Sequence, residues 1–114
     1  AGAKLIFSSD YPASISLSPW RGLHNAVNRK TIEGTPAAGW LPEHRVSVET
    51  ALKAYTVNGA FASFEENIKG VLRPGMLADF VVLDKNPMEV PPMDIYKLQV
   101  AQTVFAGRIL HPKQ

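Results

Sequence analysis

Apolar and polar positions alternate with two different periods along this chain, which predicts helices in its first part and strands in its last. Residues 4–8 contain three consecutive apolar residues, 5–7, without alternation, which is typical of a short strand covered on both faces in a parallel sheet. Ser18 and Pro19 favour a helix start, and the apolar residues of 20–29 fall on one stripe. A second helix is expected after Ser47. Its apolar positions repeat with helical spacing at Val48, Ala51, Leu52 and Tyr55.

The two predicted helices are separated and ended by loop residues. Residues 31–45 contain two glycines and two prolines with Trp40 as the large apolar anchor, so we expect a long loop packed over a groove or edge. Asn58 and Gly59 are typical of a helix end, and we expect them to end or interrupt the second helix.

The pattern changes at Gly70, after which β-branched and aromatic residues predict short strands at 70–72 and 78–84. Residues 100–105 and 108–110 are expected to pair as a hairpin, and 94–98 to form a helical turn. The chain is therefore divided into residues 1–69, with a strand, a loop and helices, and residues 70–114, with a small β portion.

Composition narrows the possible classes of protein. The 114 residues are 46% hydrophobic and 19% charged, which is typical of about one globular domain. A complete (β/α) eight-fold barrel needs roughly 250 residues and cannot be present. The net charge of +2 does not indicate nucleic-acid binding, and no apolar run reaches membrane-spanning length. The absence of cysteine excludes disulfides and thiolate zinc sites and fits a cytoplasmic protein. Because the chain starts Ala1-Gly2, we expect it to be a piece of a longer protein.

Asp10 is the strongest candidate for chemistry. It follows the predicted strand 4–8, and polar residues at the C-terminal tip of a buried parallel strand are where α/β folds place their active sites. A turn-forming role before Tyr11 and Pro12 fits its position equally well. Asp79 is interpreted as a structural carboxylate that accepts backbone N–H groups, and Asp84 as a solvent-facing cap. The histidines show no metal-ligand spacing and are interpreted as surface or partly packed residues: His24, His44 and His111.

Several stretches resemble the C-terminal part of metal-dependent amidohydrolases, and most closely amidohydrolase family 3. They are 8–12 (SSDYP), 18–23 (SPWRGL), 26–29 (AVNR), 51–56 (ALKAYT), 59–60 (GA), 70–84 (GVLRPGMLADFVVLD) and 103–108 (TVFAGR). The resemblance implies an α+β chain: the last βα unit or units of a (β/α)8 barrel, with residues 4–9 as the final barrel strand, plus part of a small C-terminal β-sandwich.

The same resemblance implies a chemistry. Asp10 matches the family's acidic residue at the tip of the last barrel strand, so we expect it to be catalytic and a metal ligand. It would take the proton of a metal-bound water and pass it to the leaving nitrogen. The full-length parent is expected to use a divalent metal ion, with zinc as the favoured metal. None is expected in this fragment, because the family's His-x-His pair and its further ligands have no counterpart here.

The expected function is hydrolysis of an amide or N-acyl C–N bond in a small-molecule substrate by the full-length parent, with the isolated chain inactive. The alternative is a non-catalytic interaction or regulatory α+β module. Tyr11 and Trp20 would form apolar walls of the site. Alternatively both pack against other parts of the chain, and this alternative is favoured for Trp20. Arg21 and Arg29 are expected in solvent. Because the sandwich would lack strands, its unpaired edges favour a homo-oligomer.

Overall fold

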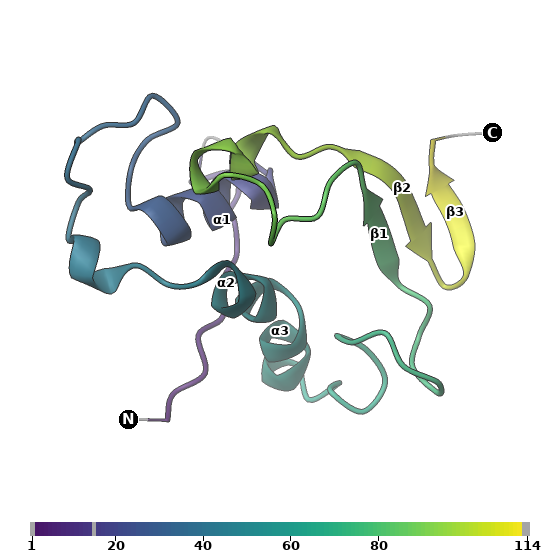
Figure 1. Ribbon diagram of the computed structural model, residues 1–114. Coiled ribbons are helices and arrows are strands. Elements are labelled where there is room, and N and C mark those ends of the chain that lie inside the picture. The colour runs from purple at the N-terminus through teal and green to yellow at the C-terminus, as the bar shows by residue number, and fades with distance from the viewer. Residues whose placement is uncertain (1, 15, 113–114) are drawn as a thin grey trace.

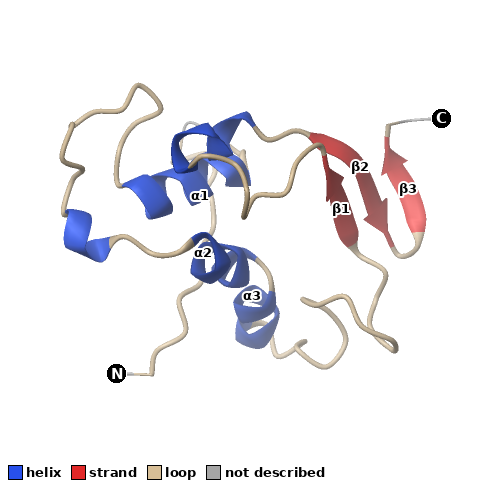
Figure 2. Ribbon diagram, viewed as in Figure 1, coloured by secondary structure: helices blue, strands red, loops and turns tan. Residues whose placement is uncertain are grey.

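The computed structural model describes residues 2–14 and 16–112 and has an α+β architecture (Figure 1). Helices and a three-stranded antiparallel sheet occupy opposite sides of the molecule (Figure 2). The elements are α1 (Pro19–Asn28), η1 (Pro42–His44), α2 (Val48–Tyr55), α3 (Val57–Ala62), β1 (Phe80–Leu83), η2 (Pro92–Lys97), β2 (Val100–Phe105) and β3 (Arg108–His111). None of the helices within the described residues has the length and apolar character needed to cross a membrane.

The core lies where α1, α2 and the 3₁₀ helix η2 meet. Its buried members come from both sides of Gly70 in the sequence, since η2 packs against α1. They are Leu23, Ala51, Ile95 and Leu98. The division of the chain at residue 70 stays a prediction.

Helix α1 has the start that its sequence predicts. Ser18 is in an extended conformation and Pro19 occupies the first helical position, where a missing N–H costs nothing. The helix ends at Asn28, and Arg29 then adopts a left-handed conformation with its N–H bonded to the Asn25 carbonyl.

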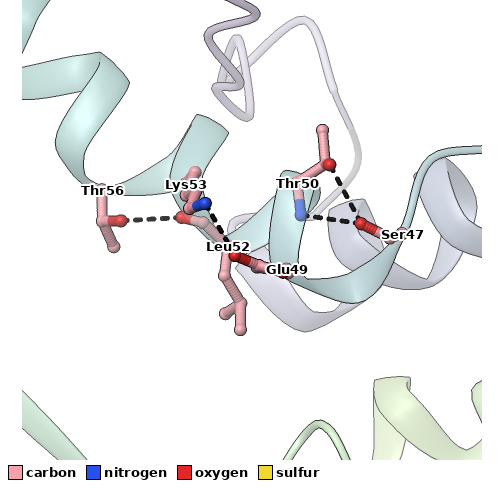
Figure 3. A network of polar contacts seen from close by, with 6 residues as sticks. All are labelled: Ser47, Glu49, Thr50, Leu52, Lys53 and Thr56. Atoms are coloured by element: carbon pink, nitrogen blue, oxygen red, sulfur yellow. Dashed lines mark hydrogen bonds and ion pairs between the residues drawn. The ribbon is translucent and has the colours of Figure 1, made fainter.

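Helix α2 is capped by side chains at both ends (Figure 3). Ser47 Oγ accepts the Thr50 N–H at 3.1 Å, as expected of an N-cap, and the Lys53 ammonium donates to Glu49 at 2.7 Å. The Thr56 hydroxyl donates to the Leu52 carbonyl at 2.8 Å.

The expected helix break at Asn58 and Gly59 is wrong, because the break lies earlier. The Thr56 hydroxyl donates to the Leu52 carbonyl and the Thr56 N–H donates to the Lys53 carbonyl, so the regular helical pattern is interrupted there. Helix α3 then runs through both Asn58 and Gly59.

The hairpin between β2 and β3 is confirmed, with Phe105 opposite Arg108. Ala106 and Gly107 both have positive φ, at 49° and 74°, as a two-residue turn of this kind requires. The structural roles of two aspartates are also confirmed. Asp79 Oδ1 accepts the Ala106 N–H at 2.7 Å, and exposed Asp84 Oδ1 accepts the Gln99 N–H at 2.9 Å.

Two predicted strands do not form. Residues 4–9 do not pair with another strand. Two hydrogen bonds hold this segment: the Phe7 N–H donates to the Ala54 carbonyl at 3.1 Å, and Asn58 Nδ2 donates to the Leu5 carbonyl at 2.8 Å. A parallel strand needs neighbours, and the described residues supply none. Residues 70–72 form a bend instead. The eight-fold barrel and the sandwich are therefore not seen in this chain, and only the coarser α+β class is confirmed.

The sheet carries large apolar side chains that are exposed to solvent. Those between 43% and 58% exposed are Val81, Val82, Phe105, Ile109 and Leu110. Such surface is normally covered by another element or another chain.

We therefore expect the isolated chain to self-associate through its sheet. Sedimentation velocity should give an average mass that rises with concentration, and the double variant Val82→Thr, Leu110→Thr should reduce this rise. A strictly monomeric chain at high concentration would contradict the expectation.

Candidate functional site

Asp10 lies at the end of the extended segment and is exposed to solvent. Its φ is 49°, a left-handed conformation that aspartate tolerates better than most residues. Two serines fix its backbone: its N–H donates to Ser8 Oγ at 3.1 Å, and its carbonyl accepts the Ser14 N–H at 3.2 Å. The carboxylate therefore stands on a tight loop with a defined backbone.

The segment before Asp10 is held from behind by α2. The ring of Phe7 meets that of Tyr55 edge to face, with centroids 5.5 Å apart and an angle of 70° between the planes. Together with the bond from the Phe7 N–H to Ala54, this contact ties the loop to a packed helix. The loop thus rests on the core, although the segment is not a strand.

A polar cavity of about 350 Å³ lies beside the Asp10 loop. Asn25, Tyr55 and Arg21 line it, and Arg21 is the charged group among its lining residues. Gly22 and five serines also line it: Ser8, Ser9, Ser14, Ser16 and Ser18. The cavity is not predicted from the sequence, because its serines lie in separate short stretches and Arg21 is exposed, as expected.

Tyr55 reaches the cavity only because residue 22 is glycine. A Cβ atom built on Gly22 would overlap Tyr55 Oη and lie 2.9 Å from Cζ. Burial raises the pKa of Tyr55 above its ordinary value, so the phenol stays protonated at neutral pH and can donate a hydrogen bond.

The predicted walls of the site are not found at this cavity. Trp20 packs against the core instead, as its alternative interpretation favoured, and Tyr11 is 60% exposed. Arg29, which was also expected in solvent, is only partly exposed. Its guanidinium lies 4.6 Å from the centre of the Trp40 ring, and its Nε donates to the Trp40 carbonyl. Trp40 itself is 64% exposed and lines a surface pocket of about 290 Å³ together with Arg29 and Pro36.

The interpretation of the histidines is wrong for His24, which is fully buried. Its Nε2 lies 3.1 Å from the Thr31 carbonyl and its Nδ1 lies 3.2 Å from Asn28 Nδ2. Because a carbonyl can only accept, Nε2 carries a proton and donates it to Thr31. His24 also packs edge to face on Tyr96 and is a structural residue. His44 and His111 are exposed.

No metal centre is formed by the residues that the structure describes. Residues 2–14 and 16–112 contain no group of three or more histidine, cysteine or carboxylate side chains that could hold an ion. Asp10 could contribute one oxygen ligand, and one carboxylate does not hold zinc at useful affinity.

Similarity to known proteins decides the family. Residues 1–111 match the amidohydrolase family. The chain belongs to the amidohydrolase family. This confirms the resemblance seen in the sequence, and it places Asp10 and the serine-lined cavity in a chain of that family.

Three curated relatives illustrate how far the similarity extends. The N-substituted formamide deformylase of Arthrobacter pascens is 33% identical over 94% of this chain and 19% of its own length. The protein LONG AFTER FAR-RED 3 of Arabidopsis thaliana is 34% identical over 96% of this chain and 18% of its own. The imidazolonepropionase of Kosmotoga olearia is 28% identical over 96% and 24%. The chain thus spans about a fifth of the length of these relatives. No solved structure matches it significantly.

Proposed function

We propose that these residues are the C-terminal part of a metal-dependent hydrolase that cleaves an amide or N-acyl C–N bond in a small molecule. The observation that carries the proposal is the family match across residues 1–111. A relative named for deformylating N-substituted formamides supports this type of bond. The exposed carboxylate of Asp10, on a loop fixed to the core, supplies a group suited to the reaction.

Asp10 has the chemistry of a proton carrier in this reaction. When water attacks the carbonyl carbon, a new C–O bond forms and the water must lose a proton, which the Asp10 carboxylate accepts. The C–N bond then breaks, and the protonated Asp10 returns that proton to the leaving nitrogen. The products are a carboxylic acid and an amine, and Asp10 ends in its starting state.

The residues of this chain do not by themselves fit the metal that the family implies. Among the described residues, no histidine cluster accompanies Asp10, so we derive no step through a metal. We propose instead that the other ligands belong to parts of the parent outside these 114 residues, and that the isolated chain is inactive.

The proposal is tested on the full-length parent with N-substituted formamides and N-acyl amino acids. We expect release of the amine, loss of turnover with a chelator, and recovery when zinc is restored. The 114-residue chain should release none. A folded, metal-loaded parent that cleaves none of these C–N bonds would contradict the proposal.

The exposed apolar side chains of β1, β2 and β3 favour a second candidate, an interaction module that binds through its sheet. The same exposure is expected of a segment whose covering strands belong to a larger protein, so this candidate ranks second. A parent protein that has no hydrolase activity and forms a stoichiometric complex through this sheet would make the interaction module the better candidate.

A further inference from the structure

We propose that the serine-lined cavity beside Asp10 binds an oxyanion, a carboxylate or phosphate group, with Arg21 as the charged partner. That the oxyanion is part of a substrate rests on the function proposed above. The capacity of the cavity to bind such a group does not depend on that function.

Two of the serine hydroxyls that line the cavity have a proton available for a further acceptor. Ser8 Oγ accepts the Asp10 N–H, and Ser16 Oγ accepts the Ser18 N–H at 3.2 Å. An oxygen that accepts a backbone N–H keeps its own proton for another acceptor, and within the described residues neither hydroxyl donates to a protein group. These two serines therefore offer O–H donors to a bound group.

Arg21 supplies the positive charge. Within the described part of the chain it forms no ion pair within 4.0 Å. Its field is felt at Glu33, whose pKa is lowered mainly by hydrogen bonds from Thr31 and its own backbone and to a smaller extent by Arg21. The planar guanidinium matches the two oxygens of a carboxylate or phosphate, which is why arginine is preferred for such groups.

Tyr55 adds a neutral donor next to Gly22. Its ring is fixed by Phe7, and the missing side chain at Gly22 leaves room for its hydroxyl. A tyrosine phenol is protonated at neutral pH, and burial raises the pKa of Tyr55 further, so it can donate to an anion without adding a negative charge. Serine hydroxyls, a phenol and one guanidinium together form a donor-rich cavity, which suits an acceptor-rich ligand.

The cavity adjoins the Asp10 loop, so a group bound in it would lie close to the proposed catalytic residue. Ser8 and Ser14 both line the cavity and both bond the backbone of Asp10. An oxyanion held there would place the rest of a small molecule near the Asp10 loop. The inference therefore narrows the substrate class to amides that carry a negatively charged group.

The binding is tested on the 114-residue chain with two probes, sodium acetate and inorganic phosphate. Each is titrated at constant ionic strength, balanced with sodium chloride, and followed by ¹H–¹⁵N NMR of the backbone amides of 8–21 and of the Arg21 Nε–H. We expect saturable shifts confined to these signals. Arg21→Gln should weaken binding by about tenfold, the value of a charge-assisted hydrogen bond.

Two further variants separate the proposed contacts from changes in the fold. Arg73→Gln makes the same substitution in an exposed turn and should bind as the wild type does. Tyr55→Phe removes one hydroxyl and should weaken binding severalfold with an otherwise unchanged spectrum.

The outcomes distinguish the sources of the anion. Saturation by acetate alone identifies a carboxylate, saturation by phosphate alone a phosphate, and saturation by both the shared oxyanion chemistry. Two results would overturn the inference. One is a set of shifts that grow linearly with the probe and are equally large when sodium chloride is titrated instead. The other is an Arg21→Gln variant that binds as tightly as the wild type. Hydrolysis by the parent is measured separately, so failure of anion binding leaves the proposed function intact and the reverse also holds.

Discussion

The variant Asp10→Asn of the full-length parent is expected to lose turnover by about 10²–10⁴-fold, the usual contribution of a positioned acid–base group. Asparagine keeps the shape of the side chain but cannot accept a proton from water. The backbone bonds to Ser8 and Ser14 remain, so the loop should stay in place. The measurement is kcat for amine release at neutral pH, with the circular dichroism spectrum as a check on folding.

Asp84→Asn is the matched control for this variant. Asp84 is also exposed, and its role is to accept the Gln99 N–H, which an asparagine oxygen can still do. Its kcat should stay within about twofold of the wild type, because substitutions away from a site usually change free energies by no more than about 0.5 kcal/mol. Equal turnover in Asp10→Asn and the wild type would remove Asp10 from the reaction.

Truncating Ile95 should have the largest effect on stability. Its side chain is fully buried between α1 and α2, and Ile95→Ala should lower the free energy of unfolding by about 2–5 kcal/mol. A domain is stable by only about 5–15 kcal/mol, so much of the folded population would be lost. Urea unfolding of the isolated chain, followed by far-UV circular dichroism, measures the change.

Ile109→Ala removes the same atoms from a side chain of β3 that is 45% exposed. This substitution should lower the free energy of unfolding by less than about 1 kcal/mol, because folding buries less apolar surface at this position. A cost as large as that of Ile95→Ala would show that the stable core includes the sheet rather than the contact of η2 with α1 and α2.

Local signals in the sequence are sufficient where the stabilising partner is close along the chain or lies on an adjacent strand of the same sheet. The Ser47 cap, the hairpin turn at Ala106 and Gly107 and the carboxylate of Asp79 depend on neighbouring residues or on one adjacent strand. Each could therefore be predicted from residue type and spacing.

Features that depend on distant partners could not be predicted in this way. The apolar residues 5–7 have the composition of a buried strand, but pairing requires strands that the described residues do not contain. His24 was missed for a different reason. It follows Trp20 by four residues and so lies on the buried stripe of α1, a signal that was present in the spacing.

The candidate site was predicted only in part. Asp10 stands out by its place after an apolar run and by the family resemblance, and its catalytic role stays a prediction. The cavity beside it joins a loop to residues of α1 and α2 that are far apart in the sequence, including Gly22 and Tyr55. No local pattern shows that an absent Cβ makes room for a phenol from another helix.

The most direct measurement of the central claim is anomalous X-ray diffraction from crystals of the full-length parent grown with zinc. The account predicts a metal peak with a carboxylate oxygen of Asp10 at about 2.0–2.2 Å, the usual zinc–oxygen distance, and histidine ligands from outside these 114 residues. A metal whose complete set of ligands leaves Asp10 turned into solvent, away from the ion, would contradict it.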